Sequence, residues 1–137
     1  MLKIEWRGRP VWVVRRTPVM IEKLGVNDGL LADPGSERSR QPDYAKNQAR
    51  AVNPEYFVVL GVCTHLGCAP ISRFEPGDAE LGADWPGGFY CPCHGSKFDL
   101  SGRVYRGVPA PTNLEVPPYT FADTGRIVIG VDQERIA

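Results

Sequence analysis

The sequence lacks an excess of charge of either sign, because 16 lysines and arginines balance 16 aspartates and glutamates. A nucleic-acid-binding domain usually carries a basic excess, so this balance argues against a nucleic-acid partner. The sequence also lacks any run of about 18 apolar residues, and no segment is predicted to span a membrane. Its first residues, Met1–Glu5, do not form the apolar core of a signal peptide.

Apolar residues are nevertheless plentiful, at 42% of the 137 residues, which excludes a disordered chain. The length fits one domain, since domains usually have about 100–150 residues. Such a chain can fold without covalent cross-links, so its four cysteines exceed what stability demands. The 15 glycines and 13 prolines indicate a turn-rich, mostly β protein.

Alternating and apolar stretches predict where the strands lie. Lys3–Arg7 and Val11–Arg15 predict a hairpin around a turn at Gly8–Pro10, and Tyr56–Leu60 predicts a buried strand. Two short helices are expected at Val19–Leu24 and Tyr44–Ala51. Further strands are expected near the end of the chain, at Leu114–Val116, Tyr119–Ala122 and Arg126–Ile129, with a tight turn at Asp123–Gly125 before the last.

All cysteines and both histidines lie in two short boxes, Cys63–Cys68 and Cys91–Ser96. Two disulfides would account for the cysteines but not for the placement of the histidines. A structural zinc module with two thiolates and two imidazoles is a normal tetrahedral site, but it leaves one cysteine in each box unused. A third possibility is a [2Fe–2S] cluster in which two cysteines hold one iron and two histidines hold the other.

The two boxes, CTHLGC and CPCHGS, resemble those of the Rieske iron–sulfur protein of the cytochrome bc1 complex, in its proteobacterial form. The likeness extends to Asp99, Gly102-Arg103, Pro109–Leu114 and Trp6–Pro18, and is weak over residues 19–52. It implies a single mostly β domain, residues 1–137, with the Rieske-type fold of antiparallel sheets. In that fold a base domain (residues 1–60 and 109–137) carries an inserted cluster-binding subdomain (residues 61–108).

The resemblance also implies the ligands of one [2Fe–2S] cluster. By this likeness, Cys63 and Cys91 ligate the inner iron, and His65 and His94 ligate the outer iron. The two imidazoles face quinol and are the catalytic residues. Each leaves one ring nitrogen free to carry a proton, which a thiolate ligand could not do.

The likeness assigns further residues around the cluster. Cys68 and Cys93 are expected to form a disulfide that ties the boxes together, which suits an oxidising compartment. Ser96 is expected to donate a hydrogen bond to a bridging sulfide. Leu66 and the proline loop that begins at Pro109 are expected to cover the cluster.

The implied function is electron transfer from quinol to a c-type cytochrome, with cytochrome b and cytochrome c1 as partners. The chain would be the iron–sulfur subunit of a quinol–cytochrome c reductase, and this fragment would be an electron carrier without turnover. The implied location is the periplasmic side of a bacterial inner membrane, reached through an N-terminal helix that this sequence does not contain. The alternatives are the Rieske subunit of another oxidoreductase, such as arsenite oxidase, and the zinc module, which would be colourless.

Position 98 generates a prediction about the reduction potential. Many mitochondrial-type relatives have a tyrosine there that donates a hydrogen bond to a ligand sulfur, whereas this chain has Phe98. Such a hydrogen bond stabilises the reduced state, which is the more negative one. A stabilisation of about 1.4 kcal/mol corresponds to a shift of about 59 mV in a one-electron reduction potential. Phe98→Tyr is therefore expected to raise the midpoint potential in voltammetry. An unchanged midpoint would show that the hydrogen-bond account of this position is wrong.

Overall fold

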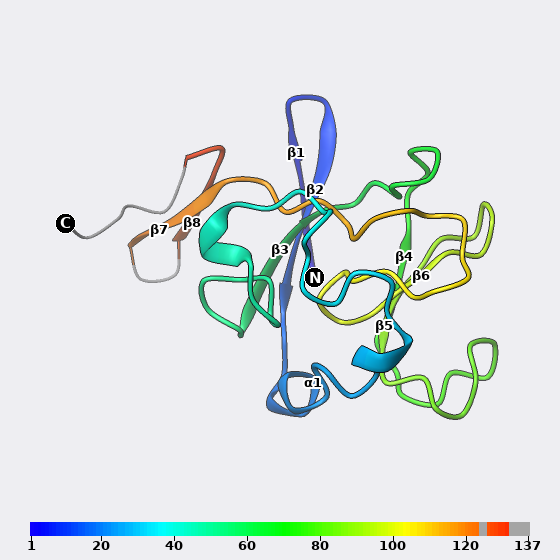
Figure 1. Ribbon diagram of the computed structural model, residues 1–137. Helices are drawn as coiled ribbons and strands as arrows, with labels where there is room; N and C mark the ends of the chain where they lie inside the picture. Colours follow the sequence, from blue (N-terminus) through cyan, green and yellow to red (C-terminus); the bar gives the residue numbers. More distant parts are fainter. Residues whose placement is uncertain (124–125, 132–137) are drawn as a thin grey trace.

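Short antiparallel strands make up most of the regular structure in a computed structural model, which describes residues 1–123 and 126–131 (Figure 1). One sheet has the order β1 (Leu2–Trp6), β2 (Arg9–Arg15), β3 (Tyr56–Leu60). The second has the order β4 (Ile71–Arg73), β5 (Gly88–Tyr90), β6 (Lys97–Phe98). A two-stranded ribbon pairs β7 (Tyr119–Asp123) with β8 (Arg126–Ile129). The helical segments are α1 (Pro18–Glu22) and two 3-10 turns, Asp28–Leu30 and Asp43–Ala45.

The expected mostly β class is confirmed, and so are the N-terminal hairpin, the buried strand β3 and the pair β7–β8. The hairpin turn differs from the prediction, because it lies at Arg7-Gly8 and Pro10 already belongs to β2. Arg7 and Gly8 have φ values of 51° and 75°, the left-handed conformation that two-residue hairpin turns require. Part of the predicted turn at Asp123–Gly125 lies outside the described residues.

Leu114–Val116 was expected to be a strand, and this prediction is wrong. Its hydrogen bonds go to three different segments: the Leu114 N–H donates to Gly102, the Val116 N–H donates to Arg40, and the Glu115 carbonyl accepts from Leu60. Two prolines follow at once, and proline has no N–H to continue a ladder. The segment is therefore an extended connection between neighbours.

The helical predictions are only partly confirmed. The first helix is present as α1, which begins at Pro18 after Thr17, whose Oγ1 accepts the Met20 N–H at 3.2 Å. Of Tyr44–Ala51, only the beginning is helical, in the turn Asp43–Ala45. The Asn47 side chain then accepts the Ala51 N–H and donates to its carbonyl, so it closes a local loop in place of a helix.

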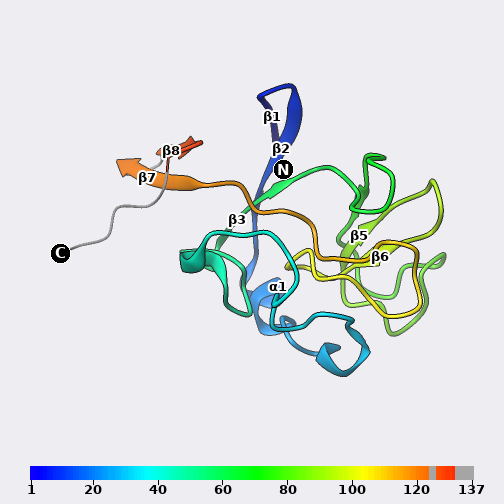
Figure 2. The same cartoon turned by 45° about the horizontal axis from the view of Figure 1, so that its top comes forward.

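Three short strands, β4, β5 and β6, lie within residues 61–108. Phe89 of β5 is fully buried, and its ring centroid lies 5.9 Å from that of Trp12 and 6.2 Å from that of Phe57. These contacts place the second sheet against the first, and the same buried cluster includes Cys63 and Cys91. Figure 2 shows β5 and β6 at one end of the molecule and the β7–β8 ribbon at the other. None of the helices within residues 1–123 and 126–131 has the length and hydrophobicity for crossing a membrane.

A buried ion pair stabilises the chain just after β6. Arg103 is 1% exposed, and its Nε donates to Asp99 Oδ2 at 2.9 Å. The other carboxylate oxygen accepts the backbone N–H groups of Ser101 and Arg103. Asp28 lies 2.8 Å from the same guanidinium, but its side chain is 45% exposed. Asp99 is therefore the main buried counter-charge of Arg103.

Asp99→Asn is expected to lower the free energy of unfolding by about 3 kcal/mol, because it removes the buried counter-charge of Arg103 and leaves only the half-exposed Asp28. Denaturant unfolding followed by circular dichroism measures this loss. Asp84→Asn is the matched control: Asp84 is exposed and has no ion pair with any described residue, so its effect should stay within about 0.5 kcal/mol. Equal effects of the two variants would contradict the assigned role of Asp99.

Candidate metal centre

The two cysteine–histidine boxes fold as loops with the same hydrogen-bond scheme. In the first loop, the Cys63 N–H donates to the Cys68 carbonyl at 2.7 Å, and the Gly67 N–H donates back to the Cys63 carbonyl at 3.0 Å. The second loop repeats both bonds, from Cys91 to Ser96 at 2.8 Å and from Gly95 to Cys91 at 2.9 Å. Gly67 and Gly95 have φ values of 77° and 82°, a conformation that residues with a Cβ rarely adopt.

The two free thiols of the chain lie on the inner side of these loops. Cys63 is 3% exposed and Cys91 is 2% exposed, and their sulfur atoms interact with each other. Burial raises the pKa of the Cys63 thiol, while the backbone N–H groups of His65 and Leu66 donate to its sulfur and act in the opposite direction. Two adjacent buried thiolates need a positive charge between them, which a metal centre supplies.

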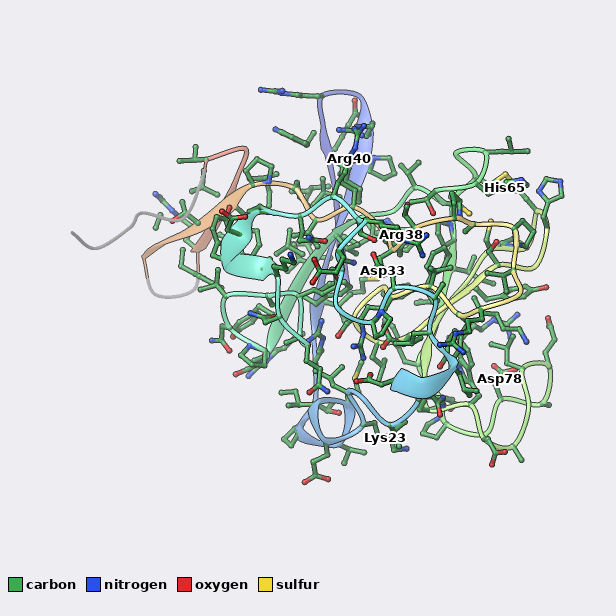
Figure 3. All side chains as sticks on the ribbon, in the orientation of Figure 1. Lys23, Asp33, Arg38, Arg40, His65 and Asp78 are labelled. Carbon is green, nitrogen blue, oxygen red and sulfur yellow. A yellow bond between two sulfur atoms is a disulfide. The ribbon has the colours of Figure 1, made fainter. Side chains whose placement is uncertain are left out.

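The two imidazoles lie on the outer side of the same loops. The ring centroids of His65 and His94 are 4.9 Å apart, in an edge-to-face arrangement. His94 is exposed and His65 is half-buried. Figure 3 shows His65 at the edge of the molecule, far from the β7–β8 ribbon. The four predicted ligands therefore form two pairs on the same two loops, one of interacting buried thiols and one of adjacent imidazoles.

The remaining two cysteines form a disulfide between the loops, so the predicted Cys68–Cys93 bond is confirmed. The Cys91 sulfur lies within 4.8 Å of both disulfide sulfurs. Because sulfurs in a disulfide are not thiolate ligands, two thiols and two imidazoles are left as donors. That donor set fits a [2Fe–2S] cluster with mixed ligation and, taken alone, also fits zinc.

Two hydrogen bonds attach the segment that follows Pro109 to the loops. Ser96 is 1% exposed, and its Oγ accepts the Ala110 N–H at 3.0 Å, so its own hydrogen remains available to donate. Thr64 Oγ1 donates to the Thr112 carbonyl at 2.7 Å. Sequence reasoning missed the role of Thr64, because no local pattern indicates a contact between residues 48 positions apart.

Both residues that were expected to cover the cluster are exposed. Leu66 is 68% exposed beside the first imidazole, and Pro109 is exposed at the start of the proline loop. Phe98 is fully buried in the apolar cluster that contains Cys63 and Cys91. Position 98 therefore belongs to the same buried cluster as the thiols, and the predicted effect of Phe98→Tyr stays a prediction.

Comparison with known proteins decides between the two metals. A family model described as the Rieske [2Fe-2S] domain matches residues 41–119, which include both loops and the proline loop. The chain belongs to the Rieske [2Fe-2S] domain family. A Rieske domain carries one [2Fe–2S] cluster, and the two buried thiols and the two adjacent imidazoles fit that cofactor. The structural zinc alternative is therefore wrong.

This Rieske domain is similar to subunits of respiratory complexes. It is 54% identical over 133 residues to the ubiquinol-cytochrome c reductase iron-sulfur subunit of Allochromatium vinosum, covering 97% of this chain and 64% of that protein. It is 47% identical over 128 residues to the mitochondrial Rieske subunit of the cytochrome b-c1 complex of Neurospora crassa, covering 93% of this chain and 47% of that protein. The chain thus spans less than two thirds of these relatives.

A solved structure supports the fold of the domain. A chain of a hyperthermophilic respiratory Complex III superimposes with a TM-score of 0.53 and 23% identity, covering 93% of this chain and 63% of that one. Since the identity is low, this likeness concerns the fold alone. It agrees with the arrangement of small antiparallel sheets described above.

Removing the disulfide is expected to destabilise the Rieske domain. The bond closes a loop between residues 25 positions apart, and its loss in Cys68→Ser/Cys93→Ser should lower the free energy of unfolding of the cluster-free chain by about 3 kcal/mol. Denaturant unfolding measures the change. A reducing agent should bring the parent protein to the stability of the variant. Equal stabilities of parent and variant under oxidising conditions would contradict the prediction.

Proposed function

We propose that this Rieske domain accepts an electron and a proton from quinol and passes the electron to a c-type cytochrome, as part of the iron–sulfur subunit of a bc1 complex. The observation that carries the proposal is a pair of adjacent imidazoles, one exposed and one half-buried, on the same two loops as a buried pair of thiols. The 54% identity to the Allochromatium vinosum subunit supports the same assignment. In this proposal, the fragment alone is an electron carrier, and turnover belongs to the complex.

The proposal assigns Cys63 and Cys91 to the inner iron, and His65 and His94 to the outer iron. Their burial supports this order, since the thiols are inside and the imidazoles are outside. His94 is assigned as the imidazole that faces quinol, because it is the more exposed of the two. A docked quinol hydroxyl could reach an exposed ring nitrogen, whereas the buried sulfurs are inaccessible to it.

The chain supports this chemistry by holding the imidazoles and by moving a proton. When bound, the cluster supplies one-electron chemistry at potentials of about −150 to +300 mV. Each imidazole that binds metal through one nitrogen keeps the other for a proton. The Cys68–Cys93 disulfide holds the loops that carry the rings, and Ser96 keeps a hydroxyl hydrogen available beside the inner side of the site.

The proposed partners are cytochrome b, cytochrome c1 and quinol, and the proposed location is the periplasmic side of a bacterial membrane. The disulfide supports an oxidising compartment. Leu66 supports docking, because a leucine that is 68% exposed next to the imidazoles offers an apolar contact to a partner. We also propose the division into a base (residues 1–60 and 109–137) and a cluster-binding insert (residues 61–108).

The pH dependence of the midpoint potential tests the function. If reduction is coupled to protonation of an imidazole, the midpoint of the holoprotein should be constant in acid. It should then fall by about 59 mV per pH unit once one proton is taken up with each electron. The midpoint falls because the reduced form binds the proton more tightly than the oxidised form does. A rise in pH therefore destabilises the reduced form relative to the oxidised form. Protein-film voltammetry measures the curve.

Two results would contradict the proposal. A midpoint that does not change from acid to alkaline pH would exclude coupled proton and electron transfer at this site. A purified protein that is colourless and gives no EPR signal after reduction would show that the cluster itself is absent. The expected protein is red-brown, and its reduced form gives an EPR signal with an average g value below 2.

A further inference from the structure

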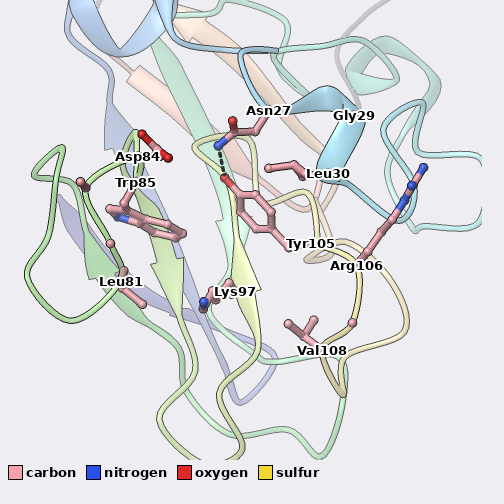
Figure 4. Close-up of a pocket in the computed structure, with 13 residues that line it drawn as sticks. Asn27, Gly29, Leu30, Leu81, Asp84, Trp85, Lys97, Tyr105, Arg106 and Val108 are labelled. Atoms are coloured by element: carbon pink, nitrogen blue, oxygen red, sulfur yellow. Dashed lines mark hydrogen bonds between the residues drawn. The ribbon is translucent and has the colours of Figure 1, made fainter.

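A cavity of about 530 Å³ lies beside the metal centre, on a side of the domain that the redox chemistry does not use. It is open to solvent on one side and is lined by the 3-10 turn at Asp28–Leu30, the loop at residues 81–85, the start of β6 and residues 105–108 (Figure 4). Its volume lies within the range of about 300–1,000 Å³ that small-molecule sites occupy. Two of its lining residues are sequence neighbours of the metal centre: Lys97 follows Ser96 at the end of the second loop, and Val108 precedes Pro109 at the start of the proline loop.

The walls of the cavity are mostly apolar and carry two aromatic rings. Trp85 and Tyr105 have ring centroids 5.9 Å apart, with Leu81, Leu30 and Val108 beside them in Figure 4. Both rings are fixed by hydrogen bonds: Trp85 Nε1 donates to the Arg73 carbonyl, and the Tyr105 hydroxyl accepts from Asn27 Nδ2. These rings can therefore pack against a flat apolar molecule with little loss of side-chain freedom.

Lys97 contributes an ammonium group to these walls. Lys97 is half-buried and lines the cavity, yet its ammonium group has no hydrogen bond or ion pair with any described residue. Arg106 also lines the cavity, but its Nε donates to the Leu31 carbonyl. Asp84 is the acidic residue among the lining residues and lies on the Trp85 side in Figure 4. The lining is thus net positive, with a free ammonium group next to aromatic walls.

We propose that this cavity binds a small organic anion with a flat apolar body, such as an aromatic carboxylate. The body packs against Trp85 and Tyr105, and the carboxylate pairs with Lys97. This chemistry satisfies the ammonium group and places apolar atoms on the apolar walls. The proposal does not depend on quinol as the substrate of the centre.

Calorimetric titration of the oxidised holoprotein with 2-naphthoate tests this site. One molecule should bind per domain, and 2-naphthamide, which has the same rings without the charge, should bind about tenfold more weakly. Lys97→Gln should weaken naphthoate binding by about tenfold, which corresponds to about 1.4 kcal/mol. Lys23→Gln is the matched control, because Lys23 is also half-buried and unpaired among the described residues but lies beside α1.

A second pair of variants places a negative charge at an exposed leucine. Leu30 is 57% exposed and lines the cavity, whereas Leu2 is 62% exposed on β1. Both variants should fold, and Leu30→Asp should weaken naphthoate binding while Leu2→Asp leaves it unchanged. The proposal is overturned if naphthoate does not bind with one-to-one stoichiometry, or if Lys97→Gln behaves as Lys23→Gln does. It is also overturned if naphthamide binds as tightly as naphthoate.

Discussion

The structure depends on the convergence of two loops that present their thiols to the core and their imidazoles to solvent. Each loop is closed by its own pair of backbone hydrogen bonds and a glycine with positive φ, so its shape is local. Their mutual position is not local, because the loops are far apart in the sequence. The Cys68–Cys93 disulfide joins them on the exposed side, and the buried Cys63 and Cys91 meet on the inner side.

The core behind the loops explains why the thiols are buried there. Phe89 of β5 packs against Trp12 and Phe57 of the first sheet, and the two sheets share one apolar cluster that includes Phe98 of β6 and both free cysteines. A buried thiolate pair is costly without a compensating positive charge. The protein therefore places the thiols where only a metal centre makes their ionised form favourable, and it leaves the imidazoles where a partner can reach them.

Polar anchors hold the segment after Pro109 over the site. Asn113 is 1% exposed; its Oδ1 accepts the Val104 N–H, and its Nδ2 donates to the Asp33 carbonyl and to Ser36 Oγ. One side chain thus connects residues 33–36 to the strand-like segment at Val104. Together with the bonds from Ser96 and Thr64, it fixes the proline loop in place. Although the net charge of the chain is zero, two of its arginines, Arg16 and Arg50, are buried, and burial lowers the pKa of each to about 10.

Local patterns in the chain were enough to predict the β class, the N-terminal hairpin, β3 and the two boxes, because alternation and loop-closing glycines act over a few residues. The donor types in the boxes limited the centre to a few metals, and the family likeness implied the disulfide pairing that the structure shows. The packing of distant segments determines that Leu114–Val116 bonds to three segments instead of forming a strand, and that Thr64 reaches Thr112. It also brought Lys97, Trp85 and Tyr105 around one cavity. These features require contacts between distant residues, which depend on how the sheets pack and leave no periodic signal in the chain.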